Sequence, residues 1–434
     1  MNLTDKPTAL QSPETQITEL LSALLMENSD FSNKVFSVGG FVRDQILKIE
    51  SNDLDLVIEI PDGAKKFSEY IHEQFQTETT AAFQKGLGYP IWHLSFIANV
   101  TYKNKLYLTQ NGAVDFADSQ KECFPDPTTR QRITTYGNLF EDIRRRDFTI
   151  NMLAQNLTTL EIIDLSGCGL TDLNSGLIQT HPHNNPDQIF ADDPLRMIRA
   201  VRFAVKYNFK IHNDIQISIQ KNAGRIQILS HERIWDELKK IISNAGLRQA
   251  LKIMIDLQLF PQIFEIDPNL IDFKDFNLKP TEPVINLIVL FSQLNHSQIK
   301  SELDQLKIEK ITKNNVLMTL SGLIELDKSF SDWQPFQMRG FARNYFDQLD
   351  YIHFFRSDYI QKIQSTIKIP LQKSPLLKGN DIVNIFNAQG AEIKTILNRA
   401  MELEDQYILI LNVEPSNKEL QAKVLELLTI EFKK

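Results

Sequence analysis

Two aspartates stand within one apolar stretch of the chain. Residues 53–60 read DLDLVIEI, so Asp53 and Asp55 alternate with leucines. If this stretch is a β-strand, its two-residue period places both carboxylates on one face, roughly 7 Å apart. Two negative charges at that separation repel each other unless a cation lies between them. Mg²⁺ binds one or two carboxylates together with substrate phosphates. The pair therefore predicts a magnesium site, and a strand end at the protein surface is the alternative.

A double glycine precedes these aspartates. Residues 37–48 read SVGGFVRDQILK, which predicts a strand that ends at Gly39 and Gly40 and a helix that carries Arg43. Backbone N–H groups at the start of a helix have no partner within it, so they can bind an anion. We expect Gly39, Gly40 and Arg43 to position phosphate groups beside the metal-binding strand, and an ordinary glycine turn is the alternative.

Three consecutive arginines follow later in the chain. Residues 141–154 read EDIRRRDFTINMLA and contain Arg144, Arg145 and Arg146. Guanidinium groups bind phosphate oxygens with paired hydrogen bonds, so the triplet predicts a phosphate-binding concentration of charge. A solvated helix face is the alternative for a triplet considered alone.

Another acid and arginine lie at helical spacing. Residues 191–203 read ADDPLRMIRAVRF, so Asp193 and Arg196 share one face of a predicted helix. This spacing presents a carboxylate and a guanidinium together at the start of the helix. Pro194 is also a natural first helical residue, so Asp193 could instead be a helix N-cap. Asp192 is expected to pair with Arg196 one turn later.

The pattern of apolar residues divides the chain into two kinds of structure. Alternating residues predict strands at KVFSVGG, LDLVIEI, IWHLSFIANVTY, KLYLTQ and GAVDFAD. From about residue 187 the period of amphipathic helices dominates. The sequence predicts an α+β protein, with a head of mixed sheet and helices followed by an all-α neck, body and tail. The expected segments are 1–30 (N-terminal tail and helix), 31–165 (head), 166–275 (neck), 276–375 (body) and 376–434 (tail).

Composition limits the possible partners. The 434 residues carry a net charge of −8, so a nucleic-acid site requires a local basic patch. Only two cysteines, Cys123 and Cys168, argue against a disulfide scaffold and fit a reducing compartment. The N-terminal residues lack the pattern of a signal peptide, and no run of about 20 apolar residues could span a membrane. We expect a cytoplasmic protein with no membrane partner.

The motifs, in their order, resemble those of one known family. GG-x-VRD followed by D-x-D resembles the catalytic motif of the DNA polymerase β-like nucleotidyltransferases. The closer resemblance is to the bacterial-type (class II) tRNA CCA-adding enzyme and poly(A) polymerase family. RRDFTIN (145–151), DDPLR (192–196) and HERIWDEL (231–238) are similar to further motifs of that family. The resemblance is specific over about residues 35–240 and implies a polymerase β-like nucleotidyltransferase head.

The resemblance also implies roles for single residues. Arg146 and Asp147 would contact the sugar and triphosphate of the nucleotide, and Asn151 completes their motif. Asp193 and Arg196 would read the Watson–Crick edge of cytosine or adenine, with Arg199 continuing a basic stripe. The residues Glu232, Arg233 and Glu237 would mainly hold the neck together.

Two further features are implied by the same resemblance. Asp115, in GAVDFAD (112–118), would be a third catalytic carboxylate beside Asp53 and Asp55, and a structural role is the alternative. Residues 119–138 are similar in place and length to a mobile loop of CCA-adding enzymes.

The implied activity is template-independent addition of C, A or both to the 3′ end of tRNA. The RNA 3′-hydroxyl would attack the α-phosphate of CTP or ATP in a Mg²⁺-dependent reaction that releases pyrophosphate. The expected partners are tRNA, CTP and ATP, and no DNA is expected. The alternatives are a poly(A) polymerase, an enzyme that adds only CC or only A, and a non-catalytic RNA-binding relative.

Overall fold

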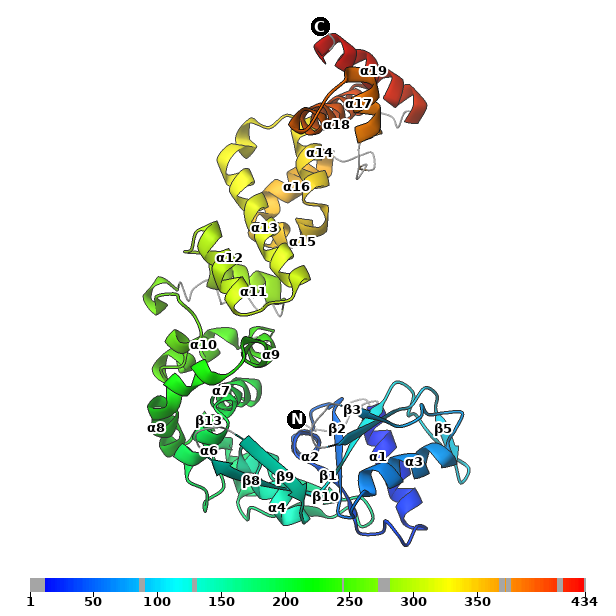
Figure 1. Cartoon of the computed structure of the whole chain (residues 1–434), viewed down its shortest axis with the longest axis vertical. Helices are drawn as coiled ribbons and strands as arrows, with labels where there is room; N and C mark the ends of the chain where they lie inside the picture. Colours follow the sequence, from blue (N-terminus) through cyan, green and yellow to red (C-terminus); the bar gives the residue numbers. More distant parts are fainter. Residues whose placement is uncertain are drawn as a thin grey trace, which may run out of the picture. The chain divides into compact units, whose positions relative to one another are not determined.

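The chain forms two compact units. The computed structural model describes residues 12–85, 90–126, 131–243, 246–271, 282–366, 371, 376–411 and 417–432. The first unit is Met1–Pro268 and the second is Asn269–Lys434 (Figure 1). The predicted head and most of the predicted neck fall in the first unit, whereas the body and tail fall in the second. The finer domain boundaries stay predictions.

A seven-stranded mixed sheet organises the first unit. Its strands lie in the order β11-β10-β1-β2-β7-β4-β3. The pair β2 and β7 is parallel, and the other neighbouring pairs are antiparallel. This sheet confirms the predicted α+β class. The strands are Val35–Val38 (β1), Leu54–Ile58 (β2), Phe83–Lys85 (β3), Ile91–Ser95 (β4), Ala113–Asp118 (β7), Leu153–Asn156 (β10) and Ile162–Asp164 (β11).

The sheet register brings the predicted motifs together. Ser37 of β1 pairs with Leu56 of β2, so the glycine turn that ends β1 lies beside the start of β2. Asp55 of β2 pairs with Asp115 of β7. Three segments that are separate in sequence therefore meet at one end of these strands.

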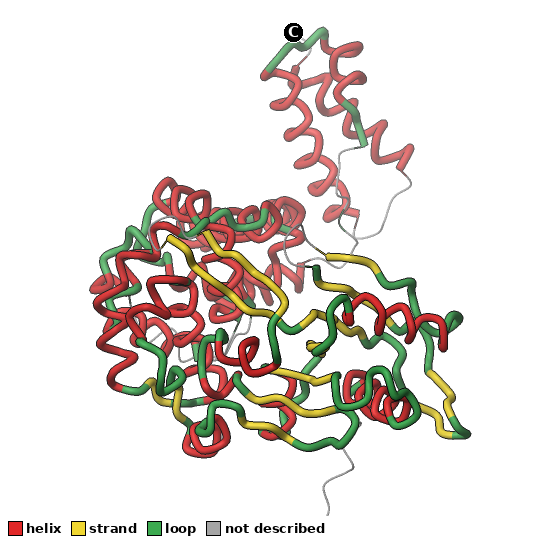
Figure 2. Tube along the Cα trace, turned by 60° about the horizontal axis from the view of Figure 1, so that its bottom comes forward, coloured by secondary structure: helices red, strands yellow, loops and turns green. Residues whose placement is uncertain are grey.

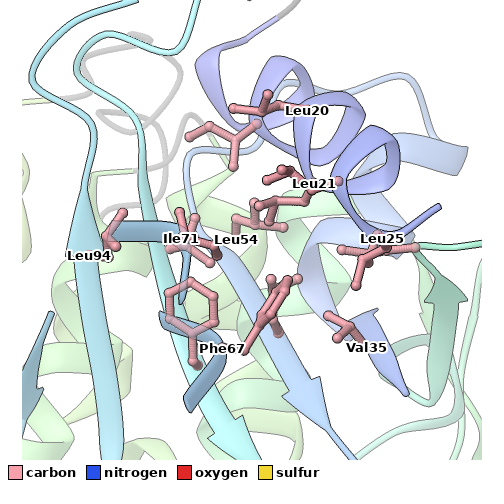
Figure 3. Close-up of a cluster of buried hydrophobic side chains, with 14 of the residues drawn as sticks. Leu20, Leu21, Leu25, Val35, Leu54, Phe67, Ile71 and Leu94 are labelled. Carbon is pink, nitrogen blue, oxygen red and sulfur yellow. The ribbon is translucent and has the colours of Figure 1, made fainter. Parts of the chain in front are cut away.

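One face of the sheet packs against helices α1 (Pro13–Leu25) and α3 (Gly63–Gln74). Helix α1 begins where the sequence favours it, because Ser12 accepts a hydrogen bond from the Thr15 N–H and Pro13 follows the cap. Leu54 and Leu56 of β2 point into this core, so Asp55 between them points to the opposite face. The core residues labelled in Figure 3 are Leu20, Leu21, Leu25, Val35, Leu54, Phe67, Ile71 and Leu94.

Three two-stranded sheets accompany the main sheet. They pair β5 (Val100–Tyr102) with β6 (Lys105–Tyr107), β8 (Gln120–Asp126) with β9 (Gln131–Tyr136), and β12 (Leu177–Ile178) with β13 (Lys210–Ile211). The β8 and β9 pair occupies the segment expected to be a loop. The polar residues at the start of β8 gave no strand signal, which is why the strands were not expected. The run ITTY (133–136) in β9 does favour a strand. Residues 127–130 of the segment lie outside the described residues.

Eight further α-helices complete the described part of the first unit. The long amphipathic helix α7 buries Met197, Ile198 and Val201 on one face and carries arginines on the other. The helices are Gly40–Ile46 (α2), Leu139–Arg144 (α4), Gly169–Ser175 (α5), Pro186–Asp192 (α6), Leu195–Tyr207 (α7), Asn213–Asn222 (α8), His231–Ile242 (α9) and Leu247–Asp256 (α10).

Within its described residues, the second unit has helices, joined by turns and loops, as its only regular secondary structure. Figure 2 colours the helices of the molecule red and its loops green. One apolar cluster includes Leu326, Phe341 and Ile352, and another includes Ile382 and Leu420. The helices are Pro283–Leu290 (α11), His296–Gln305 (α12), Lys310–Ser329 (α13), Pro335–Asn344 (α14), Leu349–Phe355 (α15), Ser357–Thr366 (α16), Gly379–Phe386 (α17), Ala391–Leu411 (α18) and Asn417–Phe432 (α19). Among the helices described here, none has both the length and the apolar character needed to cross a membrane.

Candidate active site

The glycine turn packs closely against an arginine. Gly39 has φ +67° and ψ −120°, a conformation that side chains with a Cβ rarely adopt. A Cβ at Gly39 would lie 2.6 Å from Nη1 of Arg146. Gly40 follows as the first residue of α2. The backbone conformation therefore favours glycine, and a Cβ at this position would also displace the end of the Arg146 side chain.

Asp53 and Asp55 lie beside this turn without a partner for their charge. Asp53 directly precedes β2, and Asp55 is its second residue. Within the described residues, neither carboxylate makes a hydrogen bond or an ion pair. Although solvent reaches Asp55, crowding by protein desolvates it and raises its pKa. Arg146 opposes this rise, while Asp115 and Asp53 add to it.

Asp115 lies next to Asp55 but outside the cavity described below. Its carboxylate pairs with Nζ of Lys85 at 2.9 Å and lies 2.5 Å from Nδ1 of His93. Lys85 and His93 come from β3 and β4, the strands on the far side of β7 from β2. Asp115, the expected third carboxylate, is therefore close to the acid pair. It is already bound by the ammonium group of Lys85 and the imidazole ring of His93.

The arginine triplet divides between the site and the surface. Arg145 pairs with Asp142 at 2.8 Å and with Glu122 of β8 at 2.6 Å. Arg146 pairs with Asp142 at 3.0 Å. Burial alone would raise the pKa of Asp142, but Arg146 and Arg145 together lower it, so it stays ionised and holds both arginines. Arg144 is exposed and does not line the cavity described below, so only Arg145 and Arg146 of the triplet face it.

Asp147 and Asn151 belong to a buried network. Asp147 accepts hydrogen bonds from the Asn151 amide at 2.8 Å and from Arg199 Nε at 2.7 Å. Burial opposes the charged form of Asp147, but Arg199 and the Asn151 hydrogen bond outweigh it and lower its pKa to about 2. The aspartate therefore links the segment between α4 and β10 to helix α7.

The predicted base-reading residues lie at the start of α7. Asp193 accepts a hydrogen bond from the Leu195 N–H at 3.4 Å and pairs with Arg233 of α9 at 3.3 Å. The N-cap alternative thus describes part of its contacts. Arg196 donates to the carbonyl of Arg145 at 2.8 Å. The expected pairing of Asp192 with Arg196 is wrong, because Asp192 accepts from Gln188 at 2.5 Å.

One cavity of about 620 Å³ joins these groups. It contains every predicted site residue except Asp115. The predicted residues that line it are Gly39, Gly40, Arg43, Asp53, Asp55, Arg146, Asp147, Asn151, Asp193, Arg196 and Arg199. A metal-compatible acid pair, a positively charged wall and a candidate base-reading pair therefore face the same space.

Comparisons with known proteins agree with this arrangement. A family model described as "Poly A polymerase head domain" matches residues 35–179. A second, described as "Probable RNA and SrmB- binding site of polymerase A", matches residues 208–273. The CCA-adding enzyme of Ligilactobacillus salivarius is 26% identical over 407 residues, which are 90% of this chain and 94% of that protein. Residues 35–179 thus match a poly(A) polymerase head domain, and the chain is similar to a CCA-adding enzyme along most of its length.

Further known proteins match this chain to different extents. The tRNA nucleotidyltransferase cca1 of Schizosaccharomyces pombe is 31% identical over 240 residues, which are 52% of this chain. The chain covers 44% of that yeast protein's length. The crystal structure of the Bacillus stearothermophilus CCA-adding enzyme in complex with CTP covers 98% of this chain, with a TM-score of 0.69 and 18% identity. At that identity the structural likeness establishes the shared fold.

Several residues that line the cavity were not predicted to be site residues. Arg202 was expected to continue the basic stripe of Arg199 but not to line the site, and Lys206 extends the same face of α7. The spacing of three and four residues along this face is a readable signal. Arg233 was expected to be structural, yet it lines the cavity and pairs with Asp193. No local pattern indicates that contact, because it depends on how α9 packs against α7.

Proposed function

We propose that the chain is a template-independent nucleotidyltransferase that adds C and A to the 3′ end of tRNA, using CTP and ATP. The observation that carries this proposal is the single cavity that joins the acid pair, the glycine turn and the Asp193–Arg196 pair. The CCA-adding relative that matches along 90% of the chain supports the choice of reaction. In this reaction the RNA 3′-oxygen forms a bond to the α-phosphorus of the nucleotide, and pyrophosphate leaves.

Asp53 and Asp55 fit a magnesium ion as ligands. Among the described residues, no group of three or more His, Cys, Asp or Glu side chains could hold a metal by itself. Mg²⁺ does not need such a group, because substrate phosphates supply part of its coordination. The unpartnered charges of Asp53 and Asp55, with Asp115 adding repulsion, favour a cation between them. Mg²⁺ bound there would neutralise phosphate charge and lower the pKa of the attacking hydroxyl.

The triphosphate would lie along the glycine turn and the basic wall. Arg146 contributes Nε, which is buried without a hydrogen-bond partner in the described part of the chain. An unsatisfied buried donor of this kind is costly unless a ligand completes it. Gly39, Gly40 and Arg43 would position the same phosphates. Desolvation and fixed positive charge in such a site stabilise the transition state of phosphoryl transfer.

Asp147 would position the ribose of the nucleotide in two ways: through the side chains that it holds, and through a hydrogen bond of its own. Its oxygens hold Asn151 and Arg199, and a carboxylate has acceptor sites beyond the hydrogen bonds already made. A ribose 2′-hydroxyl could donate to one of these sites, which would favour ribonucleotides over deoxyribonucleotides.

Asp193 and Arg196 would select the base. Asp193 can accept a hydrogen bond from the exocyclic amino group of either cytosine or adenine, and Arg196 can donate to a ring nitrogen of either base. Guanine and uracil carry a carbonyl where that amino group stands, so a carboxylate would repel them. Arg233 would fix the orientation of Asp193 through their ion pair.

The RNA would be held mainly by phosphate contacts, because the recognition of a tRNA by shape relies on its backbone. Local positive charge is available despite the net charge of −8, since Arg199, Arg202 and Lys206 line the cavity.

Nucleotide addition resolved to single residues tests the proposal. Purified protein with Mg²⁺ receives a tRNA lacking CCA, the same tRNA ending in CC, or a generic single-stranded RNA, each with CTP, ATP or both. Addition of C, C and A that then stops is the expected result. Two C residues only, or A only on the CC-ended tRNA, would assign half of the reaction. Long A tails on the generic RNA would instead identify a poly(A) polymerase. RNA binding without any addition would contradict enzymatic function.

A further inference from the structure

The end of helix α7 clamps a buried aspartate of helix α2. Tyr207 Oη donates to Oδ1 of Asp44 at 2.7 Å. Lys206 Nζ donates to the other oxygen of Asp44 at 3.4 Å. Asp44 is only 3% exposed, although its partners on α7 are more than 160 residues away in sequence. These contacts join the helix that follows the glycine turn to the helix that carries the candidate base readers.

The same aspartate anchors Arg43. Arg43 Nε donates to Oδ1 of Asp44 at 2.7 Å, and Arg43 Nη1 donates to Asn151. The Arg43 guanidinium lies over the ring of Tyr207, 4.6 Å from its centroid, and over the ring of Phe203 at 5.2 Å. An arginine held on its edge by a carboxylate and on its face by aromatic rings has little rotational freedom. Tyr207 therefore touches Arg43 with its ring and Asp44 with its hydroxyl.

The hydroxyl of Tyr207 acts as a donor. Burial and the hydrogen bond to Asp44 raise the pKa of Tyr207 above its ordinary value, so the phenol keeps its proton. Removing that donor would leave a buried carboxylate with one hydrogen bond fewer, which costs more than losing an exposed contact.

We propose that Tyr207 and Lys206 are positioning residues that hold the base-reading helix in register with the phosphate-binding turn. The proposal rests on the proposed function. Arg196 and Tyr207 lie at opposite ends of α7, and 11 residues of α-helix span roughly 16 Å. A rigid helix transmits a tilt at one end to the other, so the Asp44 clamp sets where Arg196 stands relative to the acid pair. None of the sequence motifs that resemble the family includes Tyr207.

The substitution Tyr207→Phe tests the clamp with least disturbance. It removes the hydroxyl and keeps the ring beneath Arg43. Tyr345→Phe is a matched control, because Tyr345 also donates to a carboxylate, Glu325, at 2.9 Å but lies in the second unit. Single additions of CTP and UTP to a tRNA lacking CCA give kcat, KM and the CTP-to-UTP preference for each variant. Thermal melting checks that each variant is folded.

We expect Tyr207→Phe to lower kcat for CTP about tenfold and to reduce the CTP-to-UTP preference, with KM nearly unchanged. Tyr345→Phe should stay within about twofold of the parent protein in each of these values. A merely structural role for Tyr207 would lower stability without changing base preference. Wild-type kcat and preference in the folded Tyr207→Phe variant would overturn the proposal.

Hydrogen–deuterium exchange separates this proposal from the proposed function. Without nucleotide, amides of α2 and of the end of α7 should exchange faster in Tyr207→Phe than in Tyr345→Phe. If the parent protein adds no nucleotide to any RNA, the proposed function is wrong. The exchange rates of the α2 and α7 amides would still test whether Tyr207 holds the two helices together. Unchanged exchange in Tyr207→Phe would show that the hydroxyl does not hold the two helices together.

Discussion

At the scale of single residues, the pKa values of two acids that line the cavity shift in opposite directions. Desolvation raises the pKa of both Asp55 and Asp147. Arg199 and Asn151 reverse that effect at Asp147, whose pKa falls to about 2. Asp55 has no comparable partner, so its pKa remains raised. The charge of Asp147 is thus stabilised by protein groups, whereas the charge of Asp55 would be stabilised by a bound cation.

Substituting Asp55→Asn should abolish nucleotide addition while the protein stays folded. We expect kcat to fall by roughly 10³-fold, because the amide is a poor Mg²⁺ ligand and the metal stabilises several kcal/mol of transition-state charge. Stability should hold or rise, since the change removes a desolvated charge. Single-turnover addition and thermal melting measure the two effects. Asp30→Asn, at an exposed position, is the control; activity near the control's level in Asp55→Asn would exclude this acid from catalysis.

Arg196→Ala should relax the choice of base. Loss of a charged donor to the base edge should narrow the preference for CTP and ATP over GTP and UTP by roughly tenfold. Competition between the four nucleotides on one tRNA measures it. Arg225→Ala is a suitable comparison, because Arg225 also donates to a backbone carbonyl, at 2.9 Å, but lies outside the cavity. An unchanged preference in Arg196→Ala would assign base selection to other residues.

At the scale of elements, the turn between β1 and α2 depends on glycine for two separate reasons. Gly39 and Gly167 both have positive φ, but a Cβ at Gly167 would meet nothing within 4 Å. At Gly39 a Cβ would collide with Arg146. Alanine at Gly167 would therefore cause backbone strain alone, whereas alanine at Gly39 would cause backbone strain and also displace Arg146.

Gly39→Ala should reduce both stability and activity, whereas Gly167→Ala should affect mainly stability. Each change imposes backbone strain of about 1–2 kcal/mol. Only Gly39→Ala should also shift Arg146 and weaken nucleotide binding, which we would measure as a rise in the Kd for CTP. Equal Kd values for the two variants would mean that Arg146 tolerates the extra methyl group and does not depend on this turn.

At the scale of the whole molecule, the second unit contains buried ionisable groups of its own. The second unit buries Arg339 and Asp405, each 1% exposed, which pair at 3.0 Å between α14 and α18. Next to them, burial raises the pKa of Glu404 to about 7, against the opposing effects of the Leu376 N–H and Arg343. Glu404 thus makes the second unit sensitive to pH near neutrality.

The second unit should lose stability as the pH rises from about 5 to 8. Folded Glu404 binds a proton up to about pH 7, whereas the unfolded chain releases it near its ordinary value of 4.5. The folded state therefore holds more protons in this window, and its stability falls with rising pH by roughly 3 kcal/mol. Glu404→Gln should remove this dependence, as denaturant unfolding at pH 5 and pH 8 would measure. Glu402→Gln, an exposed change on the same helix, should leave it in place.

Much of the site follows from local sequence. The alternation of residues 54–58 determines that Asp55 points away from the core, and the helical spacing from Arg196 to Lys206 determines one basic face on α7. The double glycine marks the turn. These are relations between residues close in the chain, where backbone period and steric restriction decide the outcome.

Other contacts depend on which distant segments pack together. The strand order puts Asp115 beside Asp55, yet β3 and β4 supply Lys85 and His93 as its partners. Asp44 meets Tyr207 only because α2 packs against α7, and Arg233 meets Asp193 only because of how α9 lies. The sequence by itself determined the chemical groups and the faces that carry them. The tertiary structure decided their partners, because strand order and helix packing are set by burial across the whole unit and not by neighbouring residues.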